Sequence, residues 1–134
     1  VPEQKAVAYH PGMAERTFFI NAPIDQARAT VLNVFTSEGW AVAPFSSDTV
    51  QISRGKKGLS IAFGALMGSE FYLSQNLQFA TGPQGETMVR YLSSTGSAFI
   101  GGAIGMRKSV KTHAEYVQKL TYALQSQGIL LGVQ

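Results

Sequence analysis

The chain has 134 residues, of which 45% are hydrophobic and only 14% are charged, and its formal net charge is +3. This length predicts a single domain that is large enough to bury a core of its own. A charge this small, without a long basic stripe of interleaved aromatic residues, does not favour nucleic-acid binding. The chain contains no Cys, which excludes disulfide bonds, thiol catalysis and zinc–thiolate sites.

The composition also bears on the compartment. The charged share lies well below the roughly 25% that is usual for globular proteins, and such a surface is typical of an extracytoplasmic protein or of one that lies against a membrane or a partner. The chain begins with Val1 instead of Met, so we expect a processed or trimmed chain, as a mature bacterial lipoprotein would be. We therefore predict the bacterial cell envelope or periplasm, with lipid anchoring as an option, and leave a cytoplasmic location open. No apolar run reaches the roughly 18 to 20 residues needed to cross a bilayer, so we expect no transmembrane segment.

The domain is predicted to start after a short arm. Residues 1–13 show no periodicity and are predicted to be flexible, which leaves a single α+β domain over residues 14–134. The first pattern in this domain is Glu15–Asn21, whose aromatic and β-branched residues predict a strand.

A helix is predicted over Ala22–Glu38. Asn21 is expected to cap it, Pro23 to lie in its first turn and Gly39 to end it in the left-handed conformation. Arg28 is expected on the solvent side. The apolar residues that recur at helical spacing and predict a buried stripe are Ile24, Ala27, Val31, Val34 and Phe35.

Alternating apolar and polar residues predict the strands that follow. Trp40–Ser53 predicts a hairpin, and residues 59–63, 71–79 and 87–93 predict three more strands. Short turns join most of these segments, which indicates antiparallel pairing. Within residues 71–79, the residues expected to face one way are Phe71, Leu73, Leu77 and Phe79.

A second helix is predicted over Met106–Gln127, with Gly128 as its end and the last six residues as a short apolar tail. The order β-α-β-β-β-β-β-α predicts an α+β fold. We expect a curved antiparallel sheet with an N-terminal β-α cassette and a long C-terminal helix packed on its concave face. The predicted buried stripe of this helix is Val110, Ala114, Val117, Thr121 and Leu124.

No group of residues matches a catalytic or metal site. His10 and His113 have neither a second His nor a carboxylate at ligand spacing, so we expect structural or surface roles for both. Gly102–Ser109 is a near miss to a phosphate-binding loop, since Arg107 stands where that motif needs Gly. We therefore predict that the protein is not an enzyme and has no catalytic residue, no metal and no cofactor.

Two basic clusters, Arg54–Lys57 and Arg107–Lys111, each flank an apolar Gly-rich segment, at residues 64–68 and 96–105. A solvated turn and a solvated helix start are the ordinary interpretation. Basic residues beside apolar loops also suit an anionic membrane surface. The sequence leaves both interpretations open.

The stretch Phe18–Ala27 reads Phe-Phe-Ile-Asn-Ala-Pro-Ile-Asp-Gln-Ala. It resembles the opening of the helix-grip domains of the START-like superfamily, which often begin with a strand and an Ala-Pro helix start and end in a long helix. The likeness in layout covers most of Glu15–Gln127. It implies a hydrophobic ligand cavity between the sheet and the last helix, which here would include Tyr116, Val117, Leu120 and Leu124.

We therefore predict a non-enzymatic protein that binds a small hydrophobic or lipid-like ligand in a cavity between the sheet and the C-terminal helix. The alternative is a bacterial cell-envelope lipoprotein that acts as an interaction or assembly module, with its apolar Gly-rich loops on an envelope protein partner. The residues expected to bind the ligand are Phe63, Leu66, Met67, Phe71, Phe99, Ile104, Val117 and Leu120.

Overall fold

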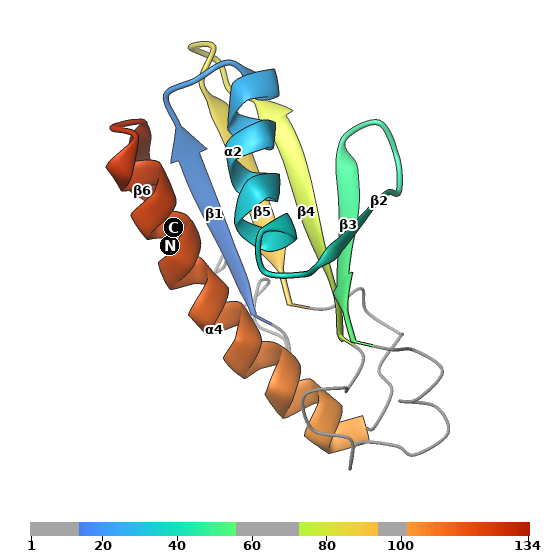
Figure 1. Ribbon diagram of the computed structural model, residues 1–134. Helices are drawn as coiled ribbons and strands as arrows, with labels where there is room; N and C mark the ends of the chain where they lie inside the picture. Colours follow the sequence, from blue (N-terminus) through green and yellow to red (C-terminus); the bar gives the residue numbers. More distant parts are fainter. Residues whose placement is uncertain (1–13, 56–72, 94–101) are drawn as a thin grey trace, which may run out of the picture.

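Six strands form one curved antiparallel sheet in the computed structural model, which describes residues 14–55, 73–93 and 102–134 (Figure 1). Two helices, α2 (Ile24–Thr36) and α4 (Gly102–Ser126), pack on the same face of this sheet (Figure 1). The predicted α+β fold with a C-terminal helix on the sheet is therefore confirmed. In their spatial order the strands are β2 (Ala41–Pro44), β3 (Thr49–Arg54), β4 (Leu73–Thr81), β5 (Thr87–Leu92), β1 (Glu15–Ile20) and β6 (Leu130–Val133).

The strand β6 lies where the sequence predicts only an apolar tail. It pairs with the second half of β1, where Val133 lies opposite Phe18. Beyond it, Thr17 and Gln134 exchange two backbone hydrogen bonds of 2.8 Å. Four residues are too few for a period of two to stand out, so this strand depends on the edge of β1 that it meets. The strand predicted at residues 59–63 lies outside the described residues.

The helix α2 spans Ile24–Thr36 and is therefore shorter at both ends than the predicted Ala22–Glu38. The helix begins at Ile24, and Pro23 occupies the cap position without any side-chain hydrogen bond to the first turn. The prediction of Asn21 as the cap is therefore wrong. At the other end, Gly39 has φ of 90°, which confirms the left-handed ending that glycine adopts most easily.

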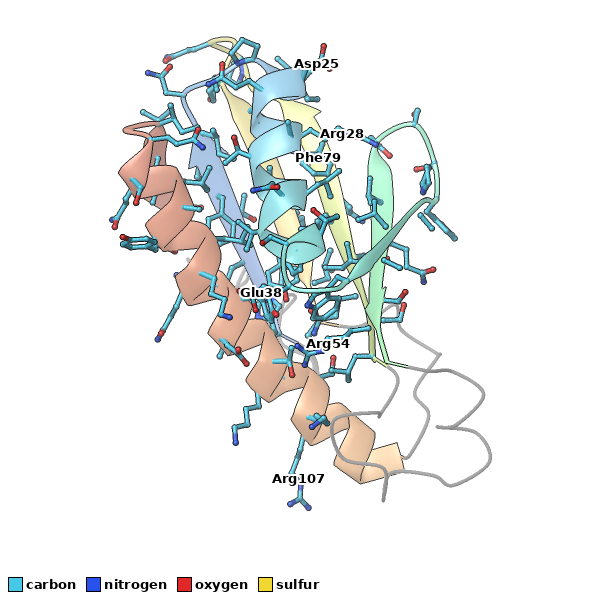
Figure 2. The ribbon with its side chains drawn as sticks, viewed as in Figure 1. Asp25, Arg28, Glu38, Arg54, Phe79 and Arg107 are labelled. Atoms are coloured by element: carbon cyan, nitrogen blue, oxygen red, sulfur yellow. The ribbon has the colours of Figure 1, made fainter. Side chains whose placement is uncertain are left out.

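The inner face of α2 carries the predicted apolar stripe, with Ala27, Val31 and Phe35 fully covered. Arg28 does not point to solvent as predicted, because its guanidinium lies 5.2 Å from the centroid of the Phe79 ring on β4 (Figure 2). The attraction between a cation and an aromatic face, together with packing of the long stem, accounts for this position.

Four aromatic rings fill the core between the helices and the sheet. Phe35 stacks on Tyr116 with ring centroids 5.0 Å apart, and Trp40 meets both rings edge-on at 5.3 Å and 5.2 Å. Tyr91 of β5 lies 5.5 Å from Phe35. Side chains therefore occupy the described space between α2, α4 and the middle of the sheet.

The helix α4 starts at Gly102, before the predicted Met106, and its buried face is turned from the predicted one. Val117 and Leu124 are buried as expected, whereas Ala114 is exposed and Val110 is half-buried. The prediction counted apolar residues only, but polar side chains with partners in the sheet occupy part of the buried face. The buried residues are Ser109, Thr112, His113, Tyr116, Val117, Leu120 and Leu124.

Candidate functional site

A groove of about 340 Å³ lies between β1 and α4. Val110, Ala114 and Val117 form its apolar wall, because residues at i, i+4 and i+7 share one side of a helix. These residues belong to the stripe that was predicted to be buried, and the groove leaves part of that stripe uncovered. The other lining residues are Ala14, Glu15, Arg16, His113 and Gln118.

The groove opens beside a part of β1 that β6 does not cover. The pairing of β6 begins at Ile20 and ends at Phe18, and the last backbone bonds join Gln134 to Thr17. None of the described strands continues this pairing alongside Glu15. The groove is thus a consequence of the short last strand.

Arg16 supplies a positive charge to the groove. It alternates with Phe18 and Ile20, which are buried under the helices, so its side chain leaves the sheet on the helix side. Glu15 leaves on the opposite face, where it pairs with Arg90. None of the ion pairs between described residues includes Arg16, and this residue is exposed.

A buried polar network fastens α4 to the sheet next to the groove. Gln75 of β4 is fully buried, and its amide nitrogen donates to the carbonyl oxygen of Ser109 at 3.0 Å and to its Oγ at 3.2 Å. The amide oxygen of Gln75 accepts from the Tyr91 hydroxyl. Ser109 Oγ donates to the carbonyl oxygen of Ser93, whose own hydroxyl accepts the N–H of Ala14 at 2.8 Å.

His113 belongs to both the network and the groove. Its ring stacks on Tyr91 with centroids 4.1 Å apart, and its Nε2 lies 2.9 Å from the Tyr91 carbonyl oxygen. Because a carbonyl only accepts, Nε2 carries the proton. Burial lowers the pKa of His113 below its usual 6.5 and outweighs the hydrogen bond, which acts in the other direction. His113 is therefore neutral at pH 7.

The network holds α4 in place and activates no nucleophile. The Ser109 hydroxyl donates its hydrogen bond to a carbonyl oxygen and not to a basic group that could activate it. Burial raises the pKa of Tyr91 above its usual 10, so the Tyr91 hydroxyl stays protonated. The described arrangement therefore supplies a firmly held groove with an apolar wall, a cation and a neutral imidazole.

A second groove, of about 460 Å³, lies between α2 and α4. Apart from Val34 and the ring of Tyr122, its walls carry charged, amide or hydroxyl groups. The polar residues that line it are Asn33, Ser37, Glu38, Glu115, Gln118 and Lys119. More charged and amide side chains line this groove than line the β1–α4 groove.

An ion-pair cluster beside this second groove joins the two helices. Glu38 Oε1 accepts from Lys119 Nζ at 2.6 Å and from the Tyr116 hydroxyl at 2.8 Å (Figure 2). The hydrogen bond from Lys119 lowers the pKa of Glu38. Arg54 lies over the ring of Trp40, with 5.0 Å between the guanidinium carbon and the ring centroid. These side chains are engaged with one another, which indicates a structural role.

The structure places only part of the predicted ligand site. Val117 lies in the wall of the β1–α4 groove, whereas Leu120 is fully buried in the core. Ile104 belongs to α4, but its side chain is outside the described residues. The remaining predicted site residues, Phe63, Leu66, Met67, Phe71 and Phe99, also lie outside them.

Sequence reasoning missed Arg16 and the uncovered position of Ala114. The alternation of Arg16 with Phe18 and Ile20 was a usable signal for the first. For the second, no pattern in the sequence indicated that polar residues one position away on α4 would be the buried ones.

No protein-family model matches the chain, and no curated protein matches it either. The resemblance to START-like domains therefore stays a prediction. Within residues 14–55, 73–93 and 102–134, no three His, Asp or Glu side chains gather in a way that could hold a metal ion. None of the helices described has the length and apolar character needed to cross a membrane.

Proposed function

We propose that the protein binds, without catalysis, a small hydrophobic ligand that carries an anionic group, and that the ligand lies in the β1–α4 groove. The observation that carries this proposal is the pairing of an apolar wall, in which Ala114 is exposed and Val110 is half-buried, with the exposed cation of Arg16. The volume of about 340 Å³ lies at the small end of the range of about 300–1,000 Å³ that is usual for ligand pockets.

The two parts of the groove would contribute differently. Burial of apolar ligand surface contributes roughly 25 cal/mol per Å², so the α4 wall would supply most of the affinity. An exposed ion pair with Arg16 adds at most about 1 kcal/mol, which is enough to orient the ligand and to favour acids over neutral analogues. The polar network supports this function because it holds α4 at a fixed distance from β1.

Filling the groove tests the proposal. Ala114→Trp places a large ring in the groove and should abolish binding of decanoate, measured by isothermal titration calorimetry. Ala29→Trp is the matched control, because Ala29 is an exposed alanine on α2 that lines neither groove. Arg16→Gln should weaken decanoate about fivefold and leave decan-1-ol unchanged. Decanoate binding of wild-type strength in Ala114→Trp would overturn the proposal.

The envelope role remains the alternative prediction. Residues 64–68 and 96–101 of its Gly-rich segments lie outside the described residues, whereas residues 102–105 belong to α4, and nothing in the described part favours this role. The upstream gene sequence would test it directly, because a signal peptide that ends in a small-residue box and a Cys indicates a lipoprotein.

A further inference from the structure

Three cations lie close to the start of α4, at one end of the molecule. Figure 2 shows Arg107 toward the start of α4 and Arg54 at the end of β3, with Asp25 at the opposite end. Asp48, in the turn between β2 and β3, lies at the same end as Asp25, and its carbonyl oxygen accepts the N–H of Phe79 near the end of β4 at 2.8 Å. The start of α4 and these two carboxylates thus lie at opposite ends of the strands.

The cations at one end form a patch on α4, which we call the basic end and define as Arg107, Lys108 and Lys111. Arg107 and Lys111 are exposed and lie four residues apart, so they share one side of the helix. None of the ion pairs between described residues includes any of the three. Within the described residues, this patch has no anionic partner.

The position of the basic end is unfavourable for the isolated helix. Acidic residues stabilise the start of a helix and basic residues stabilise its end, yet α4 has no acidic residue in its first turn and three cations soon after it. Like charges four residues apart also destabilise a helix slightly. An anionic surface would offset both the unfavourable interaction of these cations with the helix dipole and their mutual repulsion.

We propose that the basic end docks on an anionic lipid surface. In the sequence of α4, five apolar or small residues, Gly102–Met106, come directly before the first cation, and apolar residues beside cations suit a lipid interface. Single-stranded nucleic acid would call for exposed aromatic rings beside the cations. The large exposed aromatic residues of the described chain, Phe45 and Tyr122, lie instead after β2 and near the end of α4. This proposal does not depend on the groove between β1 and α4.

Vesicle sedimentation tests the docking. The wild-type chain should bind vesicles of phosphatidylcholine mixed with phosphatidylglycerol at low salt, and it should not bind vesicles of phosphatidylcholine alone. Each basic residue close to such a surface contributes about fivefold in affinity. The triple variant Arg107→Gln, Lys108→Gln, Lys111→Gln should therefore bind roughly 100-fold more weakly.

A second triple variant controls for net charge. Gln26→Glu, Ser47→Asp and Gln84→Glu change exposed residues at the end of the molecule opposite to the basic end, and they bring the net charge from +3 to 0, as the first variant does. It should keep most of the vesicle binding. Equal loss in both variants would overturn the basic end as the docking site, and so would equal binding to both kinds of vesicle. Binding to single-stranded DNA without binding to anionic vesicles would replace the lipid surface by nucleic acid.

Discussion

His113 makes the interface between α4 and the sheet sensitive to pH. The pKa of His113 in the folded state is lowered by burial, whereas in the unfolded chain it is about 6.5. The unfolded state therefore binds more protons once the pH falls below about 6.5, and the free energy of unfolding decreases from there down to the folded pKa. Arg16, on the same face of the sheet as this ring, contributes to the lowering, whereas the charge of Glu15 acts in the other direction.

Replacing His113 by Gln should remove this dependence. The Gln side chain can still donate to the Tyr91 carbonyl, but it cannot be protonated and it loses the ring stacking. We expect His113→Gln to be less stable than wild type at about pH 7, with a gap that narrows toward about pH 5. Urea denaturation of both proteins at each pH measures this gap. The carboxylates titrate in both proteins, so their effect cancels in the comparison. A gap that stays constant would show that His113 does not titrate in this range.

At the level of single residues, the sequence predicts apolar positions better than buried polar ones. Leu73, Leu77 and Phe79 alternate and face the core as predicted. Gln75 lies on the same face of β4 and is fully buried, although its polar side chain suggested a surface position. Its partners are distant in sequence, 16 residues away at Tyr91 and 34 residues away at Ser109, so no local pattern could indicate them.

Among the elements, α4 depends on this polar network for its orientation. Replacing Gln75 by Leu keeps the approximate volume but leaves the Tyr91 hydroxyl and the Ser109 groups without their partner. A buried polar group without a partner costs about 1–3 kcal/mol, so we expect a loss of about 2–4 kcal/mol in the free energy of unfolding. Gln51→Leu on β3 is the control, because Gln51 lies on the other face of the sheet and is only half-buried.

Hydrogen exchange would locate the effect of Gln75→Leu within α4. Amides around Ser109–Tyr116 should exchange faster, whereas those around Leu120 and Leu124, which pack in the apolar core, should change less. Uniform exchange along the whole helix would show that the network does not position this part of α4.

For the whole molecule, the antiparallel pairing of β2 with β3 and of β4 with β5 could be predicted from patterning and short connections, whereas the pairing of β1 with β5 could not. The strand β6 could not be predicted either, because it exists only where residues 130–133 meet the edge of the first strand, far away in sequence. A strand this short has no recognisable alternation of apolar and polar residues, because its register and pairing are set by the strand that it joins. The candidate groove shares this origin, because it opens where β6 ends.

The contact between the first and last strands leads to a prediction about cooperativity. Val133 lies opposite Phe18 and packs against the core, whereas Leu131 in the same strand is 60% exposed. We expect Val133→Asp to lower the free energy of unfolding by about 1–3 kcal/mol, because it places a charge against the apolar core. Leu131→Asp, with the same chemical change, should stay within about 0.5 kcal/mol of wild type.

The fluorescence of Trp40, the only tryptophan, reports whether the destabilisation by Val133→Asp reaches the rest of the molecule. Trp40 packs on Phe35 just before β2, which is at the opposite edge of the sheet from β6. If the molecule unfolds as one unit, Val133→Asp should shift the denaturation midpoint seen by Trp40 fluorescence as much as the midpoint seen by far-ultraviolet circular dichroism. An unchanged fluorescence midpoint would mean that β6 separates from β1 on its own. The groove between β1 and α4 would then lose its border at β6 without unfolding of the core.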